Sequence, residues 1–139
     1  MHLLMRTAFY LAAAFPLVGC TPTFVDSSGK EPYKSKLGNV CTSSVPLHAH
    51  GVTATVEREK KTDSILVTEL SLSGPEFTFS TTLPSQSTLH LVAAQECSNC
   101  ALEAQARFLV TVSPPLAQGG GVPVYIRADA VRSGVLACK

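Results

Sequence analysis

The sequence of 139 residues contains no tryptophan, no large excess of charge of one sign and no block of Lys and Arg residues. Its 11 basic and 10 acidic side chains give a formal net charge of +1. Proteins that bind nucleic acids carry a basic excess or a basic stripe, so this composition argues against nucleic-acid binding. Because 45% of the residues are hydrophobic, the chain is predicted to fold, and its length predicts a single small domain after the N-terminal segment.

The apolar run near the N-terminus, residues 8–15, is shorter than the roughly 20 residues that a membrane-spanning helix requires. It follows Arg6 and leads to Leu17-Val18-Gly19-Cys20, a pattern that predicts a signal peptide over residues 1–19. The last four residues resemble the lipobox of bacterial lipoproteins, in which the Cys thiol receives a diacylglyceryl group and becomes the mature N-terminus. The alternative is an ordinary cleavage site with a chance Cys.

The lipobox resemblance implies that the protein is anchored to a membrane through a lipid on Cys20 and does not span it. Lipoproteins retained in the inner membrane usually carry Asp after the lipidated Cys, whereas this chain carries Thr21. The resemblance therefore implies transport by the lipoprotein sorting machinery to the periplasmic face of the outer membrane.

Four cysteines remain after the anchor: Cys41, Cys97, Cys100 and Cys138. An even number in an exported domain of this size predicts two disulfides, and sequence alone allows three pairings. We favour Cys97 with Cys100 and Cys41 with Cys138, because the second pair would tie the two ends of the domain together. Closing so long a loop would stabilise the fold by roughly 4 to 5 kcal/mol in the chain-entropy model.

The residues after Cys20 divide into two parts. Residues 20–39 are rich in Pro, Ser, Lys and Gly, which predicts a lipidated N-terminus and a flexible tether. Residues 40–139 show short alternating stretches separated by turn residues. They predict an all-β domain, an antiparallel β-sandwich of about six to eight short strands.

The expected strands are identified by their alternation. The first has Val52, Ala54 and Val56 on one face, and further strands are expected at 65–72, 77–83, 89–97, 108–112, 122–128 and 134–137, with a helical turn at 101–106. The expected centre of the core is Phe77, Phe79, Leu89, Leu91, Phe108, Val110, Val124 and Ile126.

The motif Cys97-Ser98-Asn99-Cys100 has the spacing of redox motifs and of metal-binding knuckles. Redox reactivity needs a strand and helix context that is missing here. His48 and His50 could join the two Cys residues in a zinc site, but a second Cys-x-x-Cys and a His-x3-His are lacking. We therefore interpret the motif as a structural disulfide.

The histidines are interpreted as surface residues. We expect His48 and His50 to be exposed polar positions, and His90 to be a surface or partner-facing residue. Nucleophile, zinc-protease and phosphate-loop motifs are absent from the sequence. We therefore expect no catalytic residues, no metal and no cofactor, and a protein that is not an enzyme.

Three stretches resemble one known family. Residues 107–127 contain a strand ending in Thr-x-x-Pro, a loop with Gln-Gly, and a second alternating strand; residues 52–56 and 77–84 add two earlier strands. Together they are similar to the pilotins, the lipoprotein chaperones of type III secretion systems, of the Yersinia and Pseudomonas secretin type. The resemblance implies a protein that binds the C-terminal segment of a secretin subunit and assists its targeting to the outer membrane. Docking would use strand addition or a helix in a groove.

Two other functions remain open at this point. One is a structural envelope lipoprotein, with a transthyretin-like or other sandwich fold, that serves another secretion or pilus machine. The other is a periplasmic metal or thiol-redox protein that uses Cys97, Cys100, His48 and His50.

Overall fold

The computed structural model describes residues 22–54, 60–100 and 105–139. The signal peptide and Cys20 therefore lie outside the described residues, as do most of the helical turn expected at 101–106 and Val56 of the first expected strand. The described elements are β1 (Phe24–Asp26), the 3-10 helix η1 (Lys34–Lys36), β2 (Val40–Ser43), β3 (Leu47–Val52), β4 (Ser64–Thr68), β5 (Phe77–Leu83), β6 (Thr88–Cys97), β7 (Ala106–Ser113), β8 (Val124–Arg127), α1 (Ala128–Arg132) and β9 (Leu136–Cys138).

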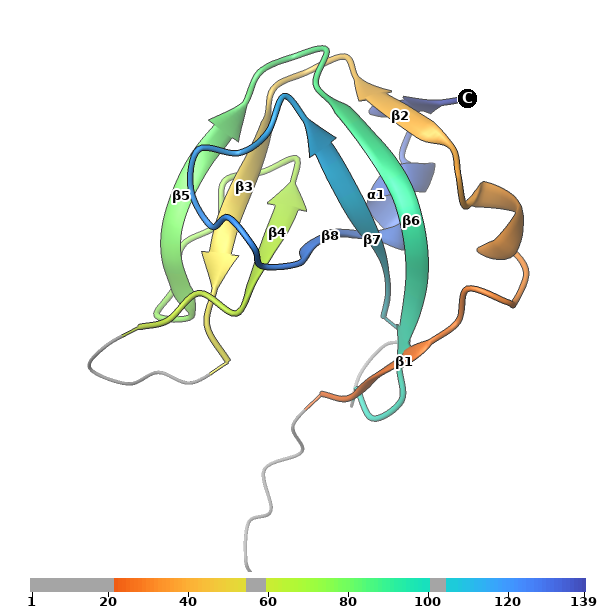
Figure 1. The fold of residues 1–139 in the computed structure, drawn as a ribbon, viewed down its shortest axis with the longest axis horizontal. Helices are drawn as coiled ribbons and strands as arrows, with labels where there is room; N and C mark the ends of the chain where they lie inside the picture. Colours follow the sequence, from red (N-terminus) through yellow and green to blue (C-terminus); the bar gives the residue numbers. More distant parts are fainter. Residues whose placement is uncertain (1–21, 55–59, 101–104) are drawn as a thin grey trace, which may run out of the picture.

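The strands form one continuous sheet in the order β5-β3-β4-β8-β7-β6-β2-β9, and β1 pairs with the far half of β6 (Figure 1). The predicted all-β class is confirmed. The two layers expected of a sandwich are here the two halves of a single sheet, β5-β3-β4 and β8-β7-β6-β2-β9. The halves meet where β4 and β8 run parallel, and every other pair is antiparallel.

Both halves of the sheet contribute to one hydrophobic core. Of the eight residues expected at its centre, five are buried: Leu89, Leu91, Phe108, Val110 and Ile126. The other three, Phe77, Phe79 and Val124, are only partly buried. The two Phe residues lie on β5, which is an edge strand and has a neighbour on one side only.

The first expected strand is wrong in position and in phase. The strand β3 begins directly after Pro46, and its inward face carries Leu47, Ala49 and Gly51, while Ala54 is exposed. The apolar side chains do not show which face of the strand is buried, because Gly51, one of the buried residues, has no side chain. A Cβ at Gly51 would collide with Thr78 and Phe79, which explains why the position is glycine.

A β-bulge changes the inward face of β6. Leu89 and Leu91 are fully buried, Val92 is exposed, and the next fully buried residue is Ala94. The pairing with β7 shifts between Leu91 and Ala93, so one extra residue lies on β6. A bulge of this kind turns a strand and moves later side chains to the other face, which is why Ala93 does not continue the expected pattern.

Residues 22–39 are not a flexible tether in this structure. β1 pairs with β6 through Phe24↔Cys97, Val25↔Glu96 and Asp26↔Gln95. Farther along, Ser27 is buried, and the Tyr33 ring packs edge-on against Phe108 with 5.9 Å between centroids. The segment is rich in polar residues, yet its few aromatic side chains attach it to the sheet.

Both favoured disulfides are present. Cys41 lies directly opposite Cys138 on the neighbouring strand, and their bond joins β2 to β9 across 97 residues of sequence. Cys97 and Cys100 close a short loop at the end of β6. In the described part of the chain, no helix is long and apolar enough to cross a membrane.

Candidate functional site

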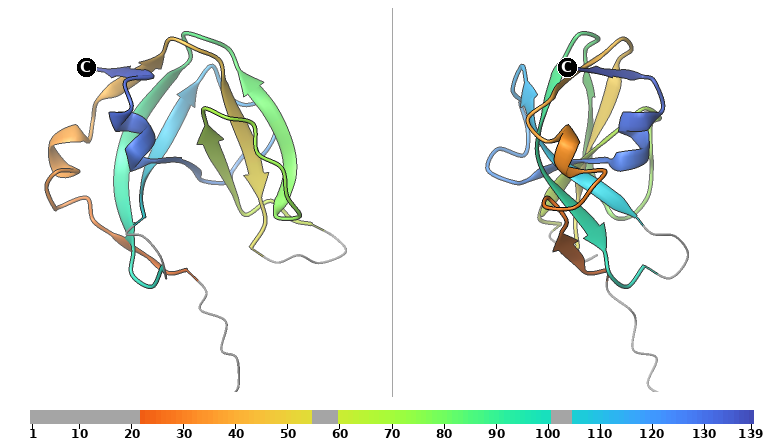
Figure 2. Two further views of the ribbon diagram at one scale, coloured as in Figure 1. Left: turned by 180° about the vertical axis from the view of Figure 1, so that it is seen from behind. Right: turned by 90° about the vertical axis from the view of Figure 1, so that its right-hand side faces the viewer.

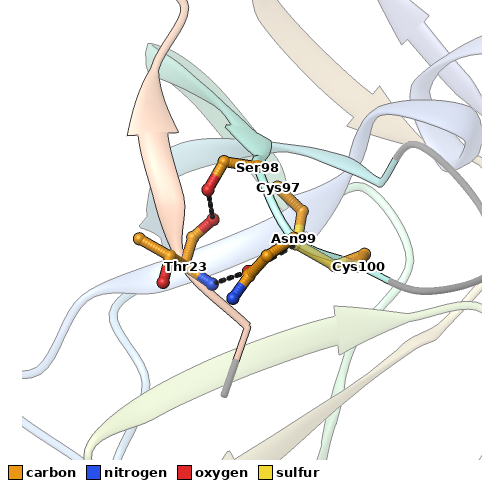
Figure 3. The surroundings of a disulfide bond; sticks show 5 residues. All are labelled: Thr23, Cys97, Ser98, Asn99 and Cys100. Atoms are coloured by element: carbon orange, nitrogen blue, oxygen red, sulfur yellow. Dashed lines mark hydrogen bonds between the residues drawn. A yellow bond between two sulfur atoms is a disulfide. The ribbon is translucent and has the colours of Figure 1, made fainter. Parts of the chain in front are cut away.

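The Cys97–Cys100 loop holds the chain just after Cys20. The carbonyl of Thr23 accepts hydrogen bonds from the Ser98 N–H at 2.8 Å and from the Ser98 hydroxyl at 3.1 Å. The N–H of Thr23 donates to Oδ1 of Asn99. Figure 3 shows Ser98 and Asn99 directed at Thr23, with the disulfide behind them. The disulfide therefore fixes the two residues that clamp the start of β1, and we call Thr23, β1 and this loop the anchor clamp.

Stacking on Arg107 holds the side chain of Phe24, the first residue of β1. The Arg107 guanidinium lies between the rings of Phe24 and Tyr125, 3.5 and 3.7 Å from their centroids. Its Nε donates to Oε1 of Gln95 at 2.9 Å. Because Phe108 and Ile126 point into the core, Arg107 and Tyr125 lie on the opposite face of the sheet. Burial lowers the pKa of Arg107, but a guanidinium stays protonated at neutral pH, so the cation–π contacts persist.

Hydrogen bonds continue this attachment beyond β1. The Ser27 N–H donates to the carbonyl of Ala94 at 2.8 Å, and the Ser27 hydroxyl donates to Oε2 of Glu96 at 2.9 Å. Lys30 pairs with the same carboxylate oxygen at 3.3 Å. The hydrogen bonds from Ser27 and Lys30 lower the pKa of Glu96, so this acceptor is ionised at neutral pH.

His50 is fully buried, so the expectation that it is exposed is wrong. Its Nδ1 lies 2.7 Å from the Ser80 hydroxyl, and its Nε2 accepts a hydrogen bond from the Leu72 N–H at 3.3 Å. The ring of Phe77 covers it, with 5.1 Å between centroids. The segment after β4 folds over this face of β3, which the alternation pattern could not reveal. Burial lowers the pKa of His50, which favours the neutral ring.

The structure does not assemble the zinc or redox set that the sequence left open. His48 is partly buried on β3 and stacks on His50, whereas Cys97 and Cys100 are joined to each other at the end of β6. Across residues 22–54, 60–100 and 105–139, no group of three or more His, Cys, Asp or Glu side chains could hold a metal ion. His90 is exposed on β6, as a surface residue should be.

A mainly apolar groove lies between the end of β4 and α1. Its volume is about 530 Å³, and its walls include Leu66, Leu70, Leu72 and Ala130. Leu70 is 73% exposed, more than any other large apolar side chain that the structure describes. Exposed apolar residues beside a groove are typical of a surface that binds another molecule. The sequence did not reveal this groove, because α1 was not expected: its first residue, Ala128, was placed at the end of a strand, and residues 129–132 were assigned to no element.

Comparisons with protein-family models, with curated proteins and with solved structures found no significant match.

Proposed function

We propose that the protein is an outer-membrane lipoprotein that acts as the pilotin of a type III secretion system. It binds the C-terminal segment of a secretin subunit and carries it to the outer membrane along the lipoprotein sorting route. The observation that carries the proposal is the position of the lipobox: Cys20 lies three residues before Thr23, where the domain begins to be clamped. A lipid on Cys20 would therefore move the whole domain, and whatever it binds, to the membrane.

The groove between β4 and α1 is the surface that we assign to the secretin segment. Its walls are largely apolar, and Leu70 and Leu72 at its rim are exposed to solvent. An amphipathic segment would gain about 25 cal/mol for each Å² of apolar surface that it buries there. The stretch that resembles the pilotin family, residues 107–127, supplies Arg127 at the end of β8 to the same groove.

Two variants test the proposal in cells. Cys20→Ser removes the lipid acceptor and is expected to mislocalise the secretin and to abolish its heat-resistant multimers. Leu70→Lys places a charge at the groove and is expected to abolish secretin binding while the lipoprotein still reaches the membrane. Val40→Lys, at a position 43% exposed on β2, is the matched control and should bind normally. Normal secretin rings in the outer membrane of a deletion strain would contradict the proposal.

The edge strand β5 favours a second function, a structural lipoprotein of another secretion or pilus machine. Its seven residues, Phe77–Leu83, carry no charge, and the strand pairs only with β3. Proteins usually protect such edges with charges or Pro, so an open neutral edge is suited to strand addition by a partner. A Thr82→Lys change would block that addition without touching the groove. Normal type III secretin assembly in Thr82→Lys, together with loss of the assembly of another secretion or pilus machine, would favour this second function.

A further inference from the structure

The described chain begins at Pro22, two residues after Cys20, and is attached to the sheet from Thr23 onwards. We propose that the anchor clamp rests on the lipid headgroups of the membrane, and that β6 leads from this surface to the opposite end of the domain. This inference rests on the lipid at Cys20, which is part of the proposed function. The partner is thus a lipid surface, and the orientation of the domain on it is fixed.

The length of chain outside the structure sets the distance. Cys20 and Thr23 are three residues apart, and an extended chain advances at most about 3.6 Å per residue, so about 11 Å separates them at most. Each headgroup layer is roughly 5 to 8 Å thick, the difference between the whole bilayer and its hydrocarbon core. A diacylglyceryl group would hold Cys20 at the inner boundary of that layer. The chain therefore reaches only a few ångströms beyond the headgroups, and the clamp has to touch them.

The clamp also prevents the domain from turning about its anchor. The carbonyl of Thr23 is bound twice by Ser98, whose loop is closed by the disulfide. Phe24 is stacked on Arg107 from the central strand β7. A tether of some twenty flexible residues would let the domain take any orientation. Here the direction in which the chain leaves the domain is set by β1.

The surface at the clamp is suited to a headgroup layer. The loop from Cys97 to Cys100 carries no charged side chain, and Ser98 and Asn99 are exposed polar residues that can meet lipid phosphates and glycerol groups. Beside it, Val25 is 44% exposed on β1 and offers an apolar side chain to the interface. The loop and Val25 carry no charge, and the one acidic residue of the clamp, Asp26, is exposed at the end of β1 that is farther along the chain from Cys20.

The strand β6 defines the opposite end of the domain. Ten residues, Thr88–Cys97, give it a length of about 33 Å. At its start, Ser43 exchanges backbone hydrogen bonds with Gln86 and Ser87, which places the β2–β3 turn and Val45 at this end. Figure 2 shows β1 at one end of the domain in both views, with β2 and the C-terminus toward the other.

A single tryptophan can report which end touches the lipid, because the chain has none. Val25→Trp and Val45→Trp are a matched pair, since the two valines are 44% and 38% exposed. The full chain is expressed with export, purified from membranes, and its acylation determined by mass spectrometry. Each variant is then reconstituted in vesicles of phosphatidylethanolamine and phosphatidylglycerol that contain a headgroup-labelled nitroxide lipid. Phe24→Trp, which keeps a ring over Arg107, is a second reporter should Val25→Trp fold poorly.

We expect strong nitroxide quenching of Trp fluorescence in Val25→Trp and Phe24→Trp, and little quenching in Val45→Trp. Equal quenching of the two ends in an acylated protein would overturn the orientation and leave the secretin function standing. A chain that is not acylated would overturn the lipid anchor and the orientation together. The expected quenching, combined with normal secretin rings in a deletion strain, would leave this inference intact and contradict the pilotin function alone.

Discussion

His50 is fully buried, and both of its ring nitrogens form hydrogen bonds. The Thr68 hydroxyl donates to the carbonyl of Leu70 at 2.6 Å, so its oxygen faces the ring Nε2 at 3.1 Å without a proton to offer. The neutral ring accepts from the Leu72 N–H at the same nitrogen and donates from Nδ1 to Ser80. A protonated ring would carry hydrogen on Nε2, so the Leu72 N–H would face another donor. The neutral ring therefore holds Leu72, whereas a protonated ring would lose the Leu72 hydrogen bond and donate from Nε2 to the Thr68 oxygen.

Protonation of His50 should make the fold pH-dependent. The unfolded chain takes up this proton as the pH falls through about 6.5, whereas burial lowers the pKa of His50 in the folded state. Between these two values the unfolded state binds more protons, so the free energy of unfolding falls as the pH falls, by at most about 1.4 kcal/mol per pH unit. Above about pH 6.5 the contribution of His50 is fully present.

His50→Gln should remove this slope. It should also lower the free energy of unfolding at neutral pH by about 1 to 3 kcal/mol, because buried partners lose their hydrogen bonds. Urea unfolding at about pH 7.5 and about pH 5 measures both effects. The control is His90→Gln at an exposed position, which should keep the wild-type slope. An identical slope in His50→Gln and the wild type would contradict the assignment.

Among the elements, β1 is the one whose attachment depends most on side chains. It has only three residues and three pairing positions on β6. A strand this short has few ladder hydrogen bonds, and the stacking of Phe24, Arg107 and Tyr125 adds to them. Cation–π contacts contribute about 0.5 to 2 kcal/mol, enough to decide whether a short terminal strand stays docked.

Arg107→Lys should loosen β1 while the rest of the sheet persists. An ammonium cannot lie flat between two rings as the planar guanidinium does, so part of the stacking is lost. Hydrogen exchange of the β1 amides is expected to quicken, by a factor of about 2 to 30, which corresponds to 0.5 to 2 kcal/mol. Arg127→Lys is the control, because Arg127 lies opposite Arg107 but forms only an exposed ion pair with Asp129. Unchanged exchange in Arg107→Lys would refute this role.

At the scale of the whole molecule, the two disulfides should contribute very differently. The bond between Cys41 and Cys138 closes 97 residues of sequence, and that between Cys97 and Cys100 closes three. The chain-entropy relation gives about 4.7 kcal/mol for the first and about 2 kcal/mol for the second. The Cys41–Cys138 bond joins β9, at one edge of the sheet, to its neighbour β2. Because the loop that it closes contains almost the entire domain, the bond constrains almost the entire domain in the unfolded state.

The double variant Cys41→Ala/Cys138→Ala should therefore lower the free energy of unfolding by about 4 to 5 kcal/mol. Cys97→Ala/Cys100→Ala is the matched comparison and should cost about 2 kcal/mol. Denaturant unfolding of both variants under non-reducing conditions gives the values. The expectation fails if the short loop proves to be the larger contributor.

The sequence predicted the all-β fold and most of the strands because their apolar alternation is strong, as at Phe108, Val110 and Val112. It failed where a residue without an apolar side chain faces the core, as at Gly51, and where a bulge at Val92 moves the pattern to the other face. It also missed β1 and β2, which are three and four residues long. Their positions depend on tertiary contacts rather than on local alternation.

The candidate site was predictable in part. The pairing of Cys97 with Cys100 was predicted correctly from the sequence, whereas the lipid anchor at Cys20 stays a prediction. The partners of that loop were not, because Thr23 and Asn99 are 76 residues apart in sequence. The only sign of this attachment in the sequence is the few apolar side chains of the polar segment, such as Phe24 and Tyr33.

The antiparallel pairing of β1 with β6 also has a mechanical consequence. A pull on residue 22 that is directed along β1 acts parallel to the strand pair that β1 forms with β6 (Figure 1). The hydrogen bonds of β1 are then loaded together in shear, and do not open one after another as they would if the strand were peeled away. The contact between Arg107 and the Phe24 ring adds to these hydrogen bonds. If the proposed lipid and partner are both bound, a domain held in this way would transmit tension between them while its N-terminal strand stays paired.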